Sequence, residues 1–131
     1  MQEVLDFLKK CKTFYIATVE GDQPRVRPFG VAEIINGKLY IQTGKSKNVS
    51  KQMQINPKIE ICAFEGPTTL RLSGVVHRDD TVETKKIFLD ANPMLRNVGY
   101  DENDDNTEIL YIDNATATFT SFGGEPKVIN F

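Results

Sequence analysis

The sequence is poor in the residues that build metal sites and disulfide frameworks. It has two cysteines, Cys11 and Cys62, that lack CxxC spacing, and a single histidine, His77. These are too few ligands for a zinc site made of cysteine and histidine. We therefore expect no metal, and we predict that both cysteines are small buried hydrophobic residues.

A strong excess of one charge and a long apolar run are also missing. Sixteen Lys plus Arg against eighteen Asp plus Glu give a net charge of −2, whereas nucleic-acid-binding domains usually carry a basic surface. The opening stretch MQEVLDFLKKC is interrupted by charges and is typical of neither a secretion signal nor a membrane span. We expect a cytoplasmic protein with no nucleic-acid or membrane partner, so any anion site must be local.

The remaining composition is that of one globular domain. The chain has 131 residues, of which 40% are hydrophobic, with nine glycines and six prolines. A chain of this length buries roughly two thirds of its unfolded surface, which is enough for a core without crosslinks. We predict a single domain over residues 1–131.

Hydrophobic periodicity predicts helices at a few places in the chain. They cover residues 4–12, 46–56, 81–92 and 94–100, with Ser46 as the expected N-cap of the second. The second and third end where Asn-Pro pairs, at 56–57 and 92–93, prevent continuation. Residues 101–106 are expected to form a solvated polar loop.

Alternating apolar residues predict that the rest is mostly strand. The strands cover residues 13–19, 25–35, 38–43, 58–64 and 69–77, followed by a closing hairpin or near-hairpin of 108–113 with 115–122. Gly74 within the fifth strand predicts a bulge or a close backbone approach. About seven strands without βαβ alternation favour an all-β, antiparallel barrel with two or three flanking helices.

Asn36-Gly37 between two apolar runs is the strongest short hairpin signal in the sequence. Antiparallel pairing across this turn places residues whose numbers sum to about 73 opposite one another. Arg27 and Pro28 would then lie near Ser46 and Lys45. The polar clusters 24–29 and 42–48 are therefore expected to be spatial neighbours.

Together these two clusters favour a phosphate site. Arginine, lysine and serine side chains would meet the free N–H groups of a helix start, a combination that binds dianions. The alternative is that Ser46 only caps the helix while Lys45, Lys47 and Lys51 are only solvated. The motifs GxxxxGK[ST] and GxGxxG are missing, which disfavours the nucleotide sites that depend on them.

The run RPFGVAEIINGKLYIQTGKSKNVSKQMQINPKIEICAF resembles the flavin-binding half of the pyridoxamine 5′-phosphate oxidase-like family, the FMN-binding split barrels. The family pattern has an arginine on the second strand, a threonine ending the third, a serine with basic residues opening the next helix, and Asn-Pro before the fourth strand. Arg27, Thr43, Ser46 and Asn56-Pro57 match it in order and spacing. Residues 73–76 and 116–126 are similar to small bacterial members, including nitroimidazole-resistance proteins.

The resemblance implies an antiparallel split β-barrel of Greek-key type that forms a homodimer with FMN at the interface. Carried over by position, Arg27 and Lys47 hold the FMN phosphate, helped by Ser46, and Asn48 is also expected to bind the cofactor. Those along the ribityl chain and the flavin ring are Pro28, Phe29, Gln42 and Thr43. Because the family has a second basic residue where this chain has Asn48, we expect one strong ammonium contact, Lys47, for which Lys45 or Lys51 could substitute.

Two departures from the family pattern bear on activity. Pyridoxamine phosphate oxidases carry a lysine where this chain has Ala32, and they end in a segment with an arginine and a histidine, whereas His77 here lies in the fifth predicted strand. We therefore expect an FMN-dependent oxidoreductase of a small molecule other than vitamin B6, with the flavin supplying the electron chemistry. The alternative is a protein that binds flavin, or another phosphate-bearing cofactor, for storage or sensing without turnover.

Overall fold

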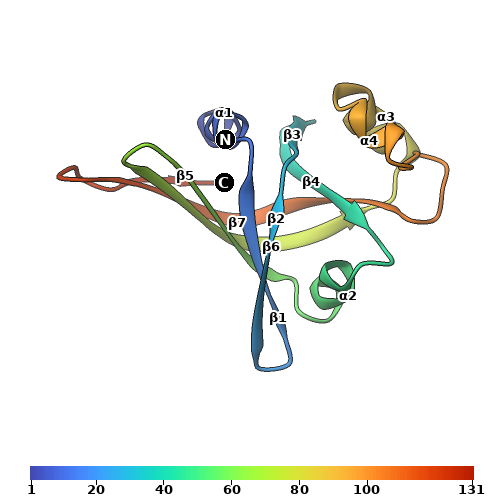
Figure 1. Cartoon of the computed structure of the whole chain (residues 1–131), viewed down its shortest axis with the longest axis horizontal. Helices are drawn as coiled ribbons and strands as arrows, with labels where there is room; N and C mark the ends of the chain where they lie inside the picture. The colour runs from blue at the N-terminus through green and yellow to red at the C-terminus, as the bar shows by residue number, and fades with distance from the viewer.

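The computed structural model describes all 131 residues as an antiparallel sheet with four helices (Figure 1). The strands are β1 Phe14–Glu20, β2 Gln23–Phe29, β3 Ala32–Ile35, β4 Lys38–Gly44, β5 Lys58–Glu65, β6 Thr68–Asp79, β7 Thr107–Ser121 and β8 Lys127–Asn130. The helices are α1 Gln2–Cys11, α2 Asn48–Ile55, α3 Val82–Ala91 and α4 Met94–Asn97. The strand order is β2-β1-β5-β6-β7-β4-β3, with β8 paired to β7.

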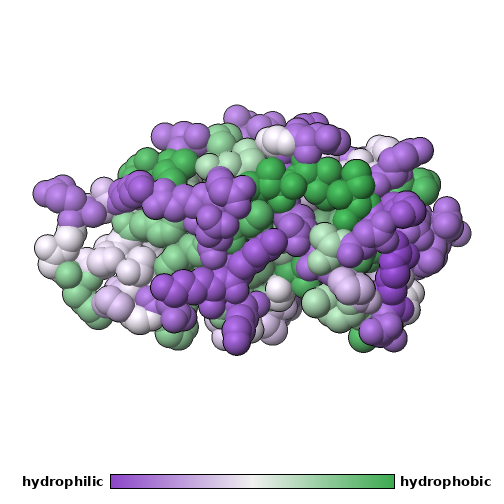
Figure 2. All heavy atoms as spheres, turned by 90° about the horizontal axis from the view of Figure 1, so that it is seen from above, coloured by the Kyte–Doolittle hydropathy of each residue, from purple (hydrophilic) through white to green (hydrophobic).

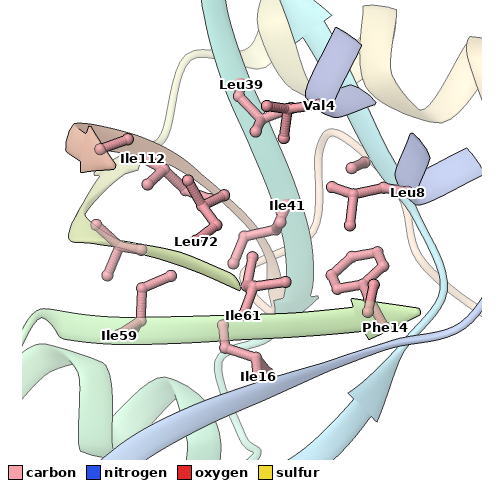
Figure 3. Close-up of a cluster of buried hydrophobic side chains, with 14 of the residues drawn as sticks. Val4, Leu8, Phe14, Ile16, Leu39, Ile41, Ile59, Ile61, Leu72 and Ile112 are labelled. Atoms are coloured by element: carbon pink, nitrogen blue, oxygen red, sulfur yellow. The ribbon is translucent and has the colours of Figure 1, made fainter. Parts of the chain in front are cut away.

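The sheet does not close into the expected barrel, because β2 and β3 end the strand order and do not pair. Its inner face carries the main core, in which Leu8, Ile16, Ile41, Ile61 and Leu72 are buried (Figure 3). Helix α1 packs against β3 and β5, and α2 packs against β1 and β4. Each helix thus contacts two strands that are not neighbours in the sheet. The helices close the core where the strands leave it open.

The β3–β4 hairpin and the bulge in β6 confirm two predictions from the sequence. Asn36 and Gly37 have φ of 51° and 75°, as a type I′ turn requires. At Gly74 the β6–β7 register shifts, and a Cβ there would lie 2.6 Å from Ile112 Cγ2. Gly74 therefore marks both a bulge and a close approach. The four predicted helices and the strands over 58–64 and 69–77 are confirmed as well.

The predicted strand over 25–35 is wrong, because the chain breaks at Gly30-Val31 into two strands that belong to different parts of the sheet. The register with sum 73 holds for β3, where Ala32 lies opposite Ile41. It does not extend to Arg27, which lies in β2 opposite Ile16 of β1. β2 is the edge strand, a position that suits its two prolines, which have no N–H to donate.

The predicted closing hairpin over 108–122 is also wrong. β7 is one strand of 15 residues, and both of its halves pair with β6. Asn114 has a φ of 48° and bends the strand beside the bulge at Gly74 without reversing it. The reversal comes later, at Phe122–Pro126, and leads into β8, which the sequence pattern did not reveal.

Smaller corrections concern the cysteines and the loop over 101–106. Cys11 is half-buried and Cys62 is exposed, so neither is buried as predicted. The loop holds the buried Glu102, and its Asp104 accepts backbone N–H bonds, so it is more than a solvated connector. None of the helices is long and apolar enough to cross a membrane.

Candidate cofactor site

A polar groove lies between β2, the end of β4 and the start of α2. It consists of two adjoining cavities of about 230 and 520 Å3 that share Arg27, Lys47 and Val49. We call it the β2–α2 groove. Leu95 and Tyr100, from α4 and the turn after it, form the far wall of the smaller cavity.

The groove brings together seven of the eight site residues expected from the sequence. The smaller cavity is lined by Arg27, Pro28, Phe29, Gln42, Thr43 and Lys47, and the larger one by Asn48. Ser46 lines neither cavity. The two polar clusters are therefore neighbours, but the contact runs from β2 to α2 and not across the predicted hairpin.

Arg27 is held in the groove by bonds to neutral groups only. Its Nη1 donates to Thr18 Oγ1 at 2.6 Å and to the Ile16 carbonyl at 3.3 Å. Its Nη2 donates to Gln52 Oε1 at 2.7 Å. Burial, together with the positive charge of Arg25, lowers the pKa of the Arg27 guanidinium. Arg27 is thus a fixed, half-buried cation without a carboxylate partner.

Thr18 and Gln52, which orient Arg27, were not identified from the sequence. Both side chains are buried, and the Thr18 hydroxyl donates to Gln52 Oε1 at 2.6 Å. A signal for each was available. Thr18 alternates with Phe14 and Ile16 on the buried face of β1, and Gln52 lies beside Met53 on the buried side of α2. Polar residues on apolar faces call for a partner.

The start of α2 adds backbone donors to the groove. Lys47, and not Ser46, is the N-cap, and no side chain caps the helix. The amide of Lys47 donates to the Gly44 carbonyl, whereas the amides of Asn48 and Val49 donate no hydrogen bond within the chain. Free amides at a helix start, with the helix dipole behind them, attract anions.

The turn that carries Ser46 is fixed from the β7 side by Asn106. Asn106 Oδ1 accepts the Ser46 N–H at 3.0 Å, and the Asn106 carbonyl accepts the Lys45 N–H at 2.7 Å. These bonds explain why Ser46 does not cap α2. A Cβ on Gly44 would lie 2.9 Å from Asn106 Nδ2 and 3.3 Å from the Tyr100 hydroxyl. A side chain at position 44 would therefore require the Asn106 side chain to shift.

Of the lysines near the groove, only Lys47 is placed at its wall without a carboxylate. Lys45 pairs with Asp80 at 3.1 Å. Lys47 lines both cavities and forms no ion pair, and Lys51 lies outside the cavities. Arg27 and Lys47, together with two free amides, can therefore hold a phosphate through charge-assisted bonds.

Comparison with known proteins identifies the family of the chain. A family model described as pyridoxamine 5′-phosphate oxidase matches residues 1–117. The chain belongs to the pyridoxamine 5′-phosphate oxidase family. No curated protein matches the chain.

Several solved structures superpose over nearly the whole chain. A NimC/NimA family protein from Clostridium acetobutylicum is 43% identical, with a TM-score of 0.96, and the match covers 100% of this chain and 92% of that one. General stress protein 26 from Bacillus anthracis is 16% identical, with a TM-score of 0.77 and coverage of 99% and 98%. A pyridoxamine 5′-phosphate oxidase-related, FMN-binding protein from Nostoc punctiforme is 15% identical, with a TM-score of 0.69 and coverage of 98% and 92%.

The two departures that bear on vitamin B6 activity, Ala32 and the position of His77, lie away from the groove. Ala32 is buried in the core, where it lies opposite Ile41. His77 is exposed on β6, where its ring stacks on Tyr111 and its Nε2 lies 3.5 Å from Asp113. His77 is therefore an exposed strand residue, and it lines no part of the β2–α2 groove.

Proposed function

We propose that this pyridoxamine 5′-phosphate oxidase family member binds FMN in the β2–α2 groove and acts as an FMN-dependent oxidoreductase on a small molecule. Arg27 carries the proposal, because it is a fixed cation that has no carboxylate partner and shares its cavity wall with unpaired Lys47. The family relationship supports it, since the protein from Nostoc punctiforme is described as FMN-binding.

The residues of the groove fit the parts of FMN. Arg27, Lys47 and the amides of Asn48 and Val49 would hold the phosphate. The cavity lined by Pro28, Phe29, Gln42 and Thr43 offers mixed apolar and polar surface for the ribityl chain and the ring. Ser46 is not among the contacts we propose, because it lines neither cavity.

Bound flavin supplies the electron chemistry itself. The residues of the chain therefore have to bind the flavin, orient it and shield it. Leu95 and Tyr100 form the wall opposite β2 and limit the space beside the ring. This division of labour fits a groove without a serine–histidine or cysteine–histidine pair.

We also propose a homodimer that completes the site. One row across the outer face of the sheet runs through Tyr15, Cys62, Arg71, Thr118 and Val128. Tyr15, Phe64 and Val128 are exposed on this side, while α1 and α2 cover the other face. Figure 2, which views the molecule from above Figure 1, shows that apolar surface also lies open between charged groups on that side. An uncovered face with exposed aromatic residues is typical of a protein interface.

The absorption spectrum of the purified protein, recorded before and after FMN addition and desalting, tests cofactor binding. We expect retained visible flavin bands, and light scattering after size exclusion should give twice the chain mass. Loss of all flavin on desalting would contradict the cofactor assignment. Reduction of the bound flavin by NADH or NADPH and reoxidation by an acceptor, both faster than for free FMN, would support the enzyme over the storage or sensing alternative.

A further inference from the structure

A guanidinium has five N–H groups, and the chain itself uses three of those on Arg27. Nη1 donates to Thr18 Oγ1 at 2.6 Å and to the Ile16 carbonyl at 3.3 Å. Nη2 donates one bond, to Gln52 Oε1 at 2.7 Å. No hydrogen bond within the chain uses Nε–H or the second N–H of Nη2. These two donors are therefore left for a ligand.

The two free donors lie on one edge of the Arg27 guanidinium. Thr18 Oγ1 and Gln52 Oε1 are bonded to each other at 2.6 Å, so they meet the end of the guanidinium, where Nη1 and Nη2 lie side by side. Nε and Nη2 form the adjoining edge, which we call the side edge. Arg25 and Arg71 each use this same edge to bind one glutamate oxygen. On Arg27 the side edge has no partner within the chain.

The Thr18 hydroxyl fixes the end of the guanidinium. It accepts from Arg27 Nη1 and donates to Gln52 Oε1, so it holds the guanidinium and the glutamine oxygen in place together. Thr18 is 2% exposed and Gln52 is 6% exposed. Thr18 lines neither cavity of the β2–α2 groove, whereas Arg27 lines both. An effect of Thr18 on a ligand must therefore act through Arg27 or Gln52.

The acceptors at the guanidinium end are neutral, and this leaves the charge of Arg27 available to a ligand. A glutamate in place of Gln52 would pair with the guanidinium, as Glu20 pairs with Arg25 at 2.9 Å. A hydroxyl and an amide oxygen orient the group without neutralising it. Two parallel N–H groups on one edge match two oxygens of a phosphate. Because they are already fixed, little ordering is needed when the ligand binds.

We propose that Thr18 and Gln52 are positioning residues that present the side edge of Arg27 to the cofactor phosphate as a two-bond fork. This inference rests on the proposed function, because the phosphate is that of bound FMN. It adds which edge of Arg27 binds and which two residues select that edge. Lysine has the same charge but no such edge, so it cannot replace Arg27.

The fork is tested first with inorganic phosphate, because this probe needs no flavin. The FMN-free full chain, labelled with nitrogen-15, is titrated while the arginine Nε–H signals are recorded by NMR, and Arg27→Lys identifies the Arg27 signal. We expect a saturable shift of this signal. The Arg71 signal should not move, because its side edge is bonded to Glu60. An Arg27 signal that neither phosphate nor FMN moves would overturn the proposal.

The positioning role is tested by the preference for FMN over riboflavin, which lacks the phosphate. Thr18→Val should lower this preference by about tenfold, because the guanidinium is then free to turn, and should change riboflavin affinity by less than about twofold. Thr18→Ser keeps the hydroxyl and should retain the preference. Thr84→Val is the matched control, because Thr84 is a buried threonine of α3 that lines neither cavity, and it should change neither affinity.

Two further variants act on the fork itself. Gln52→Glu should lower the preference for FMN by at least about tenfold, because its carboxylate would pair with the guanidinium. Arg27→Lys should lower it by about tenfold, although the charge is kept. If circular dichroism shows that Thr18→Val does not fold, the Arg27→Lys comparison decides, and an unchanged preference in that variant would overturn the fork.

The results also separate this inference from the proposed function. No loss of FMN affinity in Thr18→Val, or equal losses for FMN and riboflavin, would overturn the positioning role, because a residue that only supports the fold affects both ligands alike. If the chain does not bind FMN but phosphate shifts the Arg27 signal, the fork is supported and the proposed function fails.

Discussion

Two regions of the molecule differ in how their arginine and lysine side chains are paired. Around α3 and α4, cations are paired. Arg96 contacts Asp90 at 2.8 Å and Glu102 at 2.6 Å, and Lys86 contacts Asp90 at 2.7 Å. In the β2–α2 groove, Arg27 and Lys47 have no carboxylate partner. Although the chain has a net charge of −2, the groove therefore contains unpaired positive charge, and such a site is suited to an anion.

The largest effect should come from removing the fixed cation of the groove. Arg27→Ala should weaken FMN by about 100-fold, because two or more charge-assisted bonds of about 1.5–3 kcal/mol are lost. Arg25→Ala is the comparison, since Arg25 also lines the larger cavity of the groove but is paired with Glu20 at 2.9 Å, so its removal should weaken FMN less. Fluorescence titration of FMN checks both variants. Equal losses in the two would break the contrast between paired and unpaired cations.

A smaller loss is expected at the helix start. Lys47→Ala should weaken FMN by about tenfold, because one charge-assisted bond to the phosphate is removed. Lys51→Ala, which removes an unpaired cation one turn further along α2 and outside the cavities, should change the affinity by less than about twofold, because exposed charges interact weakly through water. The same titration, repeated at higher salt, should weaken FMN binding to the unmodified chain. An unchanged Kd for Lys47→Ala would remove Lys47 from the site.

A substitution at Gly44, where the two regions meet, should change both the stability of the fold and the affinity for FMN. Gly44→Ala places a Cβ against Asn106 Nδ2 and the Tyr100 hydroxyl, so we expect a loss of about 1–3 kcal/mol in the free energy of unfolding. Displacement of the turn after Gly44 should also weaken FMN a few-fold. Gly124→Ala is the control, because its nearest atoms would be at 3.8 Å. Urea denaturation measures the stabilities, and equal values for the two variants would be evidence against a tight junction.

The smallest effect concerns the pH dependence of the paired region. Burial raises the pKa of Asp104, but hydrogen bonds from Thr107, Asn106 and Asp101 outweigh it and lower the pKa overall. A folded pKa below the unfolded value of about 3.9 stabilises the fold at higher pH. This stability is lost as the pH falls through the folded pKa.

Melting temperatures measured from pH 6 down to pH 3 test this dependence, over a window of about three units that spans the unfolded Asp pKa. Asp104→Asn cannot ionise, so its melting temperature should fall less steeply with acid than that of the unmodified chain. FMN affinity at neutral pH should be nearly equal for the two, because Asp104 lies outside the groove. If the melting temperatures of the two proteins fall equally steeply with decreasing pH, Asp104 does not contribute to the pH dependence of stability.

The sequence predicted local structure better than long-range pairing. The Asn36-Gly37 turn and the Gly74 bulge follow from backbone geometry that only a few residue types adopt, so local sequence revealed them. The break at Gly30-Val31 and the bend at Asn114 depend on which strands pair. The alternation of apolar and polar residues is the same before and after both positions, so it does not reveal them. Strand partners therefore had to come from the structure.

The candidate site shows the same division. Family order located the residues that line the groove, including Arg27 and Thr43. It did not reveal that Thr18 and Gln52 orient the Arg27 guanidinium. It also did not reveal that Asp80 forms an ion pair with Lys45. These contacts join segments far apart in the chain. A motif identifies the basic residues, but only the structure shows which of them lack a carboxylate partner.

Parallel titrations with FMN and riboflavin test the central claim most directly, because the two ligands differ only in the phosphate. If Arg27 and Lys47 are free to hold that phosphate, FMN should bind at least about 100-fold more tightly than riboflavin. The difference should largely disappear in the Arg27→Ala, Lys47→Ala double variant. Equal affinity for FMN and riboflavin in the unmodified chain would contradict the account.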